Sequence, residues 1–331
     1  MSASAADESV SSVPGGAAGA AAVKERVAVI GAGLMGCGIA QVFAAGGWPV
    51  VLQDIRPESL EAAPQAIRRN LTFLAERGLG DASAIEPALA RVSTTTFLEE
   101  AAGGAAFVVE CVFEDLVLKQ EVFRALDAAA RPETVLATNT SVISITEIAS
   151  LAERRERIVG THFWNPPYLI PLVEVVRARD TATETMNRTM AILTAAGKHP
   201  VRVEKDVPGF VANRLQHALW REAISIVEHG IADAATVDEC VRYGFGLRLP
   251  ILGPMENADM VGLDLTLSIH DYILGHIEAS PEPSPLLREK VAAGELGFKS
   301  GSGFQGWTAD QAQASRDRLL AYLVGVLKDR V

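Results

Sequence analysis

Residues 26–36, RVAVIGAGLMG, decide the fold of this chain. The segment RVAVI has the composition of a buried parallel strand, and it leads directly into a glycine-rich turn and then a helix. In such a turn Gly31 permits the sharp bend, Gly33 lets a pyrophosphate approach the backbone, and Gly36 lets the helix pack closely on the strand. The phosphate then lies at the N-terminus of the helix. The residues predicted to bind a dinucleotide here are Gly31, Gly33, Leu34, Met35 and Gly36.

The next predicted strand ends at an acidic residue, as expected for a dinucleotide-binding domain. Residues 48–53 form a second apolar segment that ends at Asp54, 23 residues beyond Gly31. A carboxylate at this position accepts hydrogen bonds from the adenosine ribose diol and repels a 2′-phosphate. We therefore expect a Rossmann-type domain that binds NAD rather than NADP, with Arg56 as the one hint of the opposite preference.

The composition fits an enzyme of two domains, with 331 residues, of which 49% are hydrophobic and 21% charged. The net charge of −11 argues against a nucleic-acid-binding surface, and no 18-residue apolar run suggests a membrane helix. Residues 1–23 are rich in Ala, Gly and Ser without a basic segment, so we expect a disordered tail rather than a signal peptide. The scattered Cys37, Cys111 and Cys240 predict neither a disulfide framework nor a metal site, and they indicate a reducing cytoplasm.

Strands and helices alternate through residues 24–205, as a doubly wound parallel sheet requires, whereas only helices are expected in residues 206–331. The further strands are predicted at residues 92–95, 106–112, 135–138, 158–162, 172–176 and 199–203. Helices are predicted at residues 115–130, 186–196, 210–230, 236–243, 255–277, 286–293 and 309–328. The sequence therefore predicts an α/β NAD-binding domain followed by an all-helical substrate and dimerisation domain.

One histidine and one glutamate stand out in residues 160–176, GTHFWNPPYLIPLVEVV. His162 ends a strand-like run, and Glu174 lies 12 residues later inside an apolar strand, where a carboxylate is costly to bury unless it is paired. A buried anion would orient an imidazole and favour its charged form, so the two residues are a candidate acid/base dyad. The alternative is a core histidine with Glu174 on a solvent-facing edge.

The chain resembles the L-3-hydroxyacyl-CoA dehydrogenase family over about residues 25–310. The segments that carry the resemblance are GAGLMGCGIAQ from Gly31, ECVFEDLVLK from Glu110, TNTSVISI from Thr138, GTHFWNPPYLIPLVEV from Gly160 and KDVPGFVANRL from Lys205. The resemblance implies oxidation of a 3-hydroxyacyl-CoA to the 3-ketoacyl-CoA with hydride transfer to NAD, as in fatty acid metabolism.

The resemblance also implies roles for individual residues. His162 would be the catalytic base, Glu174 its partner, and Ser141 and Asn213 would contact the substrate. Among the predicted cofactor residues it adds Glu110, Lys119 and Asn139 to Asp54 and the glycine-rich turn. Asn165 is a further substrate candidate. From the residues alone, Ser141 could instead cap a helix, Asn213 could be a hinge residue, Asn165 could orient its own loop, Glu110 could be a cap, and Lys119 could be solvated.

The departures from the family pattern fall in the substrate region. Acyl-CoA members typically carry a basic residue in the middle of the loop before LVEV, where this chain has residues 169–171, LIP. The second domain is more similar to side branches of the family that act on L-gulonate, carnitine or hydroxymethylpyridine carboxylates. Arg68, Arg69 and Arg77 could meet CoA phosphates or form a solvated basic face. The substrate is thus expected to be a 3-hydroxyacyl-CoA, with a non-CoA hydroxy acid as the alternative.

Two other readings compete with a dehydrogenase of this family. A catalytically idle relative, such as a lens crystallin, should have lost the dyad or the glycine-rich turn, and both are present here. The 6-phosphogluconate type of dehydrogenase uses a catalytic lysine in a different motif. We also expect a homodimer, because the second domain carries more apolar residues than a small bundle should need to bury.

Overall fold

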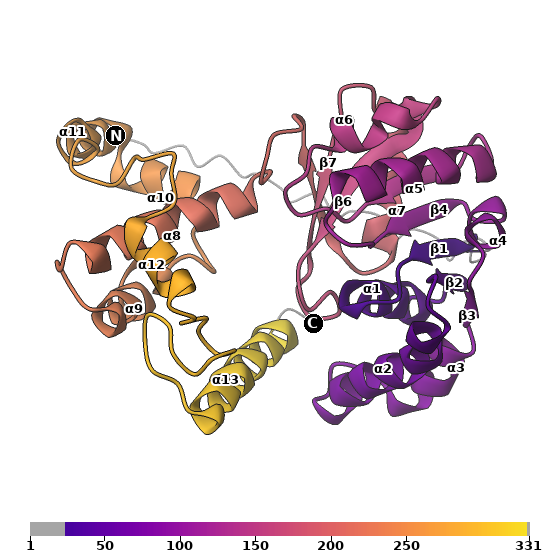
Figure 1. Cartoon of the computed structure of the whole chain (residues 1–331), viewed down its shortest axis with the longest axis horizontal. Helices are drawn as coiled ribbons and strands as arrows, with labels where there is room; N and C mark the ends of the chain where they lie inside the picture. Colours follow the sequence, from indigo (N-terminus) through magenta and orange to yellow (C-terminus); the bar gives the residue numbers. More distant parts are fainter. Residues whose placement is uncertain (1–23, 330–331) are drawn as a thin grey trace, which may run out of the picture.

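The computed structural model describes residues 24–329, so the tail predicted at residues 1–23 lies outside the described part of the chain. The first part of the chain is built around an eight-stranded sheet, in the order β3-β2-β1-β4-β5-β6-β7-β8, which lies in one of the two lobes seen in Figure 1. The strands are β1 (Val27–Ile30), β2 (Val50–Gln53), β3 (Val92–Thr95), β4 (Phe107–Glu110), β5 (Val135–Thr138), β6 (Ile158–Phe163), β7 (Leu172–Val176) and β8 (His199–Val203). The predicted α/β class with a Rossmann-type sheet is confirmed.

Helices cover both faces of the sheet because its central strands are apolar on both sides, and two hydrophobic clusters result. One face packs on α1 (Leu34–Ala45), α2 (Pro57–Glu76) and α7 (Thr183–Ala195). The other packs on α4 (Leu98–Gly103), α5 (Leu116–Ala129) and α6 (Ile145–Ile148). A short α3 (Ile85–Leu89) packs beside α1 and α2. This layering holds the carboxyl ends of β1, β4, β5 and β6 at one edge.

The predicted parallel sheet is interrupted at one pair of strands. Strand β7 pairs antiparallel with β6, and β8 pairs parallel with β7. The cause is the short connection from Trp164 to Pro171, because a parallel return needs a crossover of about a dozen residues or more. The reversal places His162 and Glu174 directly opposite each other across the two strands.

The second part of the chain contains helices but no strand longer than an isolated bridge among its described residues. They are α8 (Ala212–Glu228), α9 (Ala234–Tyr243), α10 (Pro254–Val261), α11 (Leu263–Ile273), α12 (Pro285–Ala292) and α13 (Ala309–Lys328). The single helix predicted at residues 255–277 was wrong. Gly262 divides it, because its φ of 103° lies outside the helical region and is accessible chiefly to glycine.

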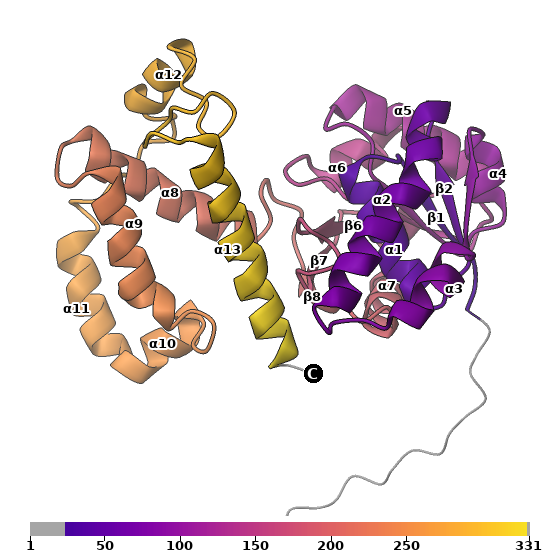
Figure 2. The ribbon, with the colours of Figure 1, turned by 90° about the horizontal axis from the view of Figure 1, so that it is seen from below.

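The two parts form separate lobes (Figures 1 and 2). Among the described residues beyond 205, the buried hydrophobic side chains are Phe210, Ala312 and Val324. In contrast, α10 and α11 leave large apolar side chains open to solvent, including Met255, Met260, Leu263, Leu265, Leu267 and Ile269. The helical lobe therefore does not cover its own apolar surface.

Candidate active site

His162 and Glu174 form a buried pair at the end of β6. His162 Nδ1 lies 2.8 Å from Glu174 Oε2, and the two residues are 4% and 1% exposed. The other carboxylate oxygen, Oε1, accepts the backbone N–H groups of Val211 and Ala212 at the start of α8. Burial would raise the pKa of Glu174, but the hydrogen bonds from His162, Ala212 and Val211 outweigh it and hold the pKa below its usual value. The pair is therefore an imidazole oriented by a charged carboxylate.

Ser141 lies on the turn that follows β5, within reach of the second lobe. The side-chain amide of Asn213 donates to the carbonyl oxygen of Ser141 at 3.2 Å, so these two predicted substrate residues lie together. Ser141 caps no described helix. The cap of α6 is Ser144, whose hydroxyl accepts the N–H of Glu147. The hydroxyl of Ser141 thus remains exposed at the carboxyl edge of the sheet.

Glu114 holds this turn, and sequence reasoning missed it. Its Oε1 accepts the Thr140 hydroxyl at 2.5 Å, the Ser141 N–H at 2.9 Å and the Val142 N–H at 3.3 Å. The side chain is 38% exposed, and its other oxygen lies 3.4 Å from Lys119 Nζ. The signal that could have revealed it is its place just after β4, at the edge where such sheets bind ligands.

Glu110 and Lys119 meet in the interior instead of at the surface. Lys119 Nζ donates to Glu110 Oε1 at 2.8 Å, and the two side chains are 1% and 0% exposed. The Thr138 hydroxyl donates to the other Glu110 oxygen at 2.7 Å. Burial raises the pKa of the Glu110 carboxyl despite the ammonium beside it. The alternative of a solvated lysine is therefore wrong, whereas Glu110 does accept a backbone N–H, that of Val112 at 2.6 Å.

Asn139 joins this network to the catalytic strand. Its Oδ1 accepts the N–H of Phe163 at 2.9 Å, and its own N–H donates to the carbonyl oxygen of Glu110 at 2.8 Å. Asn139 therefore lies at the same sheet edge as His162.

The glycine-rich turn fits a dinucleotide. A Cβ on Gly31 would lie 2.8 Å from the Cys111 carbonyl oxygen, and one on Gly36 would lie 1.8 Å from the Gly31 carbonyl oxygen, so both positions require glycine. Gly33 faces open space and is the N-cap of α1 without a side-chain hydrogen bond. The first N–H groups of α1, at Leu34 and Met35, are thus available to a phosphate.

Asp54 is held ready at the end of β2. Its carboxylate accepts the N–H of Ala32 at 2.8 Å and the N–H of Arg56 at 2.9 Å. Burial would raise the pKa of Asp54, but these hydrogen bonds and the Arg56 guanidinium outweigh it and lower the pKa. Arg56 Nε lies 3.3 Å from the carboxylate. Arg56, the one residue that hinted at a preference for NADP, is therefore paired with Asp54 itself.

The loop that carries Asn165 is fastened from below by a lysine. Asn165 is exposed, and Lys198 Nζ donates to the carbonyl oxygens of Pro167 at 2.6 Å and Ile170 at 2.5 Å. Burial lowers the pKa of Lys198 to about 8. Asn165 makes no hydrogen bond to His162 or Glu174.

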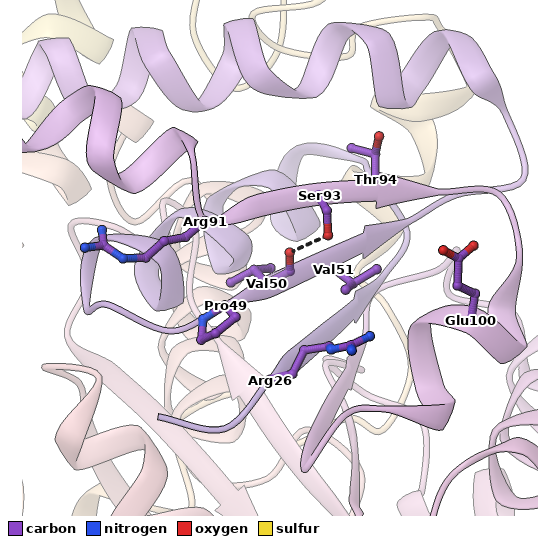
Figure 3. Close-up of a pocket in the computed structure, with 8 residues that line it drawn as sticks. All are labelled: Arg26, Pro49, Val50, Val51, Arg91, Ser93, Thr94 and Glu100. Atoms are coloured by element: carbon purple, nitrogen blue, oxygen red, sulfur yellow. Dashed lines mark hydrogen bonds between the residues drawn. The ribbon is translucent and has the colours of Figure 1, made fainter. Parts of the chain in front are cut away.

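A separate pocket of about 320 Å³ lies at the other end of the sheet (Figure 3). Its lining includes Arg26, Pro49 and Arg91, which directly precede β1, β2 and β3. Open α/β sheets bind their ligands at the carboxyl ends of the strands, so this pocket is not the dyad's site. Residues 24–329 contain no cluster of three metal-ligating side chains. Within the same residues, no helix is long and apolar enough to cross a membrane.

Comparison with known proteins accounts for both lobes. Residues 26–207 match the NAD-binding domain of 3-hydroxyacyl-CoA dehydrogenase, and residues 209–307 match the C-terminal domain of the same enzyme. The chain belongs to the 3-hydroxyacyl-CoA dehydrogenase family. It is an NAD-dependent oxidoreductase that acts on CH–OH groups, as the glycine-rich turn, Asp54 and the dyad predict.

Two similar proteins carry different substrate names. The chain is 37% identical to 5-formyl-3-hydroxy-2-methylpyridine 4-carboxylate 5-dehydrogenase of Mesorhizobium japonicum, over 92% of this chain and 99% of that protein. It is 40% identical to a probable 3-hydroxybutyryl-CoA dehydrogenase of Bacillus subtilis, over 85% of this chain and 96% of that protein. A crystal structure of the pyridine-carboxylate enzyme, described as an NAD+ dependent dismutase, matches with a TM-score of 0.84 at 35% identity, over 92% of this chain and 98% of that one.

Proposed function

We propose that this family member uses His162 as the general base and Glu174 as its charge partner. The observation that carries the proposal is the 2.8 Å contact between His162 Nδ1 and Glu174 Oε2 in a buried setting. With the Nδ1 proton donated to Glu174, His162 Nε2 keeps a lone pair and can take the proton of a substrate hydroxyl. The carboxylate then offsets the positive charge that develops on the ring, in a site where low dielectric strengthens the interaction.

The neighbouring residues would orient the reacting oxygen. The exposed Ser141 hydroxyl can donate to it, and the Asn213 amide lies next to the same turn. Glu114 fixes the turn through three donors, which keeps the Ser141 backbone in place. A bound NAD would supply the acceptor for the hydride that leaves the substrate carbon. Gly31, Gly33, Leu34, Met35, Gly36 and Asp54 would hold it, with Asn139, Glu110 and Lys119 supporting the edge nearest the dyad.

The substrate predicted first from the sequence is an L-3-hydroxyacyl-CoA of the 3-hydroxybutyryl type. The contacts of the arginines on and just after α2 argue against a CoA substrate. Arg68 pairs with both oxygens of Glu86, and Arg77 stacks on Phe73 at 3.9 Å and lies 3.7 Å from Glu76. Arginines already engaged in this way offer less to the phosphates of CoA.

Helix α13 supports the alternative of a small substrate without CoA. It begins beyond residue 307, where the match to the family's C-terminal domain ends. The pyridine-carboxylate enzyme aligns over 92% of this chain, about the share that residues 24–329 make up, whereas the Bacillus protein aligns over 85%. The alignment with the pyridine-carboxylate enzyme is therefore long enough to include α13. We therefore favour a hydroxy-bearing or hydrated formyl-bearing carboxylate, whose C–OH group His162 can deprotonate in the same way.

We also propose that the helical lobes of two chains pack together as a homodimer. The support is the open apolar surface of α10 and α11. The predicted boundary near residue 205 places this surface in the second domain. A reducing cytoplasm is our proposed location, because Cys37, Cys111 and Cys240 are all free thiols.

A substrate panel tests the proposal. The wild-type enzyme and a His162→Gln variant are assayed by NADH absorbance with acetoacetyl-CoA, L-gulonate, carnitine, and hydroxymethyl- and formylpyridine carboxylates. We expect turnover of a small carboxylate by the wild type, loss of at least about 1000-fold in His162→Gln, and unchanged NADH binding by fluorescence. Turnover of the CoA thioester alone would reverse our choice of substrate. Near-normal turnover in His162→Gln would remove the mechanism.

A further inference from the structure

The linker between the two lobes adopts an unusual backbone conformation beside the dyad. Gly209 and Phe210 are both left-handed, with φ of 76° and 50°. Phe210 is the one non-glycine residue with positive φ in the described part of the chain. This conformation is strained for a bulky residue, and such residues persist where surrounding contacts hold them, often at functional sites.

The left-handed turn has two results at His162. The Phe210 side chain is buried, 1% exposed, and its ring centre lies 5.6 Å from that of the imidazole. The turn also directs the next two N–H groups, of Val211 and Ala212, to Glu174 Oε1 at 2.9 and 3.0 Å. On another side the imidazole faces Trp164, with ring centres 5.3 Å apart. Glu174 is therefore the charged partner of a ring that otherwise meets aromatic side chains.

The linker is anchored on the Rossmann lobe just before this turn. The Asp206 carboxylate accepts the Ser144 hydroxyl at 2.6 Å and the Thr146 N–H at 2.7 Å. The N–H of Phe210 then donates to the carbonyl oxygen of Val207 at 3.0 Å. Because the chain is fixed on both sides of Pro208, Phe210 cannot leave the left-handed region without breaking these contacts.

We propose that Phe210 is a positioning residue for the His162 base. Its ring covers the imidazole against water, and its backbone conformation delivers two N–H groups to the oxygen of Glu174 that His162 does not use. The orientation of the dyad is thus set from the second lobe as well as from the sheet. This inference rests on the proposed role of the dyad, but it makes a claim about His162 that can be measured without a substrate.

Two matched substitutions distinguish a role of Phe210 in positioning His162 from a role in core packing alone. Phe210→Leu removes the aromatic ring from the dyad, whereas Phe43→Leu makes the same change at a side chain that is 0% exposed between Trp48 and Phe107. Both should lower stability. Only Phe210→Leu should lower kcat, by about 10- to 100-fold, with KM and NADH binding within about threefold, because misplacing a catalytic base by about 1 Å costs this much.

Proton exchange at His162 Nδ1, followed by NMR, gives the readout that does not need turnover. In Phe210→Leu we expect the proton between His162 Nδ1 and Glu174 to exchange faster with water, because the Phe210 ring no longer covers the imidazole. Phe43→Leu should leave this exchange rate as it is in the wild type. If the enzyme turns over no substrate of the panel, the proposed function fails while this exchange rate still decides the inference.

Gly209→Ala tests the backbone part and guards against misfolding of Phe210→Leu. The new Cβ would make only ordinary contacts, with Arg214 Cγ at 3.4 Å, Asn213 Cβ at 3.7 Å and the Arg214 backbone nitrogen at 3.8 Å, so its cost comes from the left-handed conformation. With the Phe210 ring retained, the exchange rate of the His162 Nδ1 proton should still rise, but by less. Exchange rates that match Phe43→Leu in both variants would overturn the proposal.

Discussion

The Rossmann lobe packs two large hydrophobic clusters within one chain, whereas the helical lobe buries few of its apolar residues. Two clusters fill both faces of the sheet, and the central strands β1 and β4 are buried at every residue. Beyond residue 205 the described chain buries only Phe210, Ala312 and Val324 among its hydrophobic residues, and Phe210 packs toward His162. The first lobe therefore has a hydrophobic core of its own, whereas the exposed apolar side chains of the second support the homodimer that we propose.

The largest effect is expected from substitutions on the exposed apolar surface of α11, which should weaken the proposed homodimer. Leu263 and Leu267 lie one turn apart and are 64% and 62% exposed. Replacing both with Asp should weaken the proposed homodimer by about 4 kcal/mol, roughly 1000-fold, because charge would be buried at the centre of an apolar interface. Light scattering should then report 35.1 kDa in place of a dimer of twice that mass.

The control is an equally exposed apolar side chain on the other lobe. Phe97, 67% exposed before α4, can be changed to Asp without loss of the dimer if the partner surface belongs to the helical lobe. A wild-type protein that is monomeric at micromolar concentration would reject the homodimer.

A smaller effect is expected at the cofactor edge of the Rossmann lobe. Asp54→Ala removes the acceptor for the ribose hydroxyls and the repulsion of a 2′-phosphate, so NAD binding should weaken by about 1–3 kcal/mol. NADP should lose little or improve, because Arg56 is then released from its partner. Fluorescence titration with the two reduced cofactors measures the change. A wild type that prefers NADP would show that Arg56 governs the choice.

The smallest effect concerns acid stability, which should differ between the lobes. Asp54, Glu114, Asp127 and Glu174 lie in the Rossmann lobe, and hydrogen bonds and cations hold the pKa of each below its usual value although burial would raise it. A carboxyl with a lowered folded pKa contributes stability above its unfolded pKa of about 4, and that contribution is lost as the pH falls through the folded value.

Asp127→Asn provides the measurement for this prediction. The carboxylate pairs with Arg157 and Arg154 and accepts the N–H of Glu153. Denaturant unfolding of the variant should show lower stability at pH 7 and a smaller further loss between about pH 5 and pH 3 than the wild type. An unchanged pH slope would show that Asp127 is not among the groups responsible.

The sequence predicted what local pattern determines. The glycine-rich turn with Asp54 led to the α/β class and to NAD, both of which are confirmed. The pairing of His162 with Glu174 followed from the cost of burying a lone carboxylate, and the two side chains do meet. Patterns of this kind need only neighbouring residues or one strong energetic constraint.

The remainder depends on contacts between distant segments. The direction of β7 follows from how a short loop returns, and the break at Gly262 follows from one backbone angle. Glu114 was missed because its three donors lie 26 to 28 residues away. The second set of bonds to Glu174 comes from N–H groups on another lobe, and no side-chain pattern reveals a backbone donor.

The central claim is that His162 and Glu174 act as one unit, and a double-mutant cycle tests it most directly. Glu174→Gln should lower kcat by about 2–4 kcal/mol, or roughly 30- to 1000-fold, and His162→Gln by at least as much. If the unit is real, the double variant should be little worse than His162→Gln alone, with NADH binding intact in all three. Losses that simply add in the double variant would contradict the account, because Glu174 would then act somewhere other than through His162.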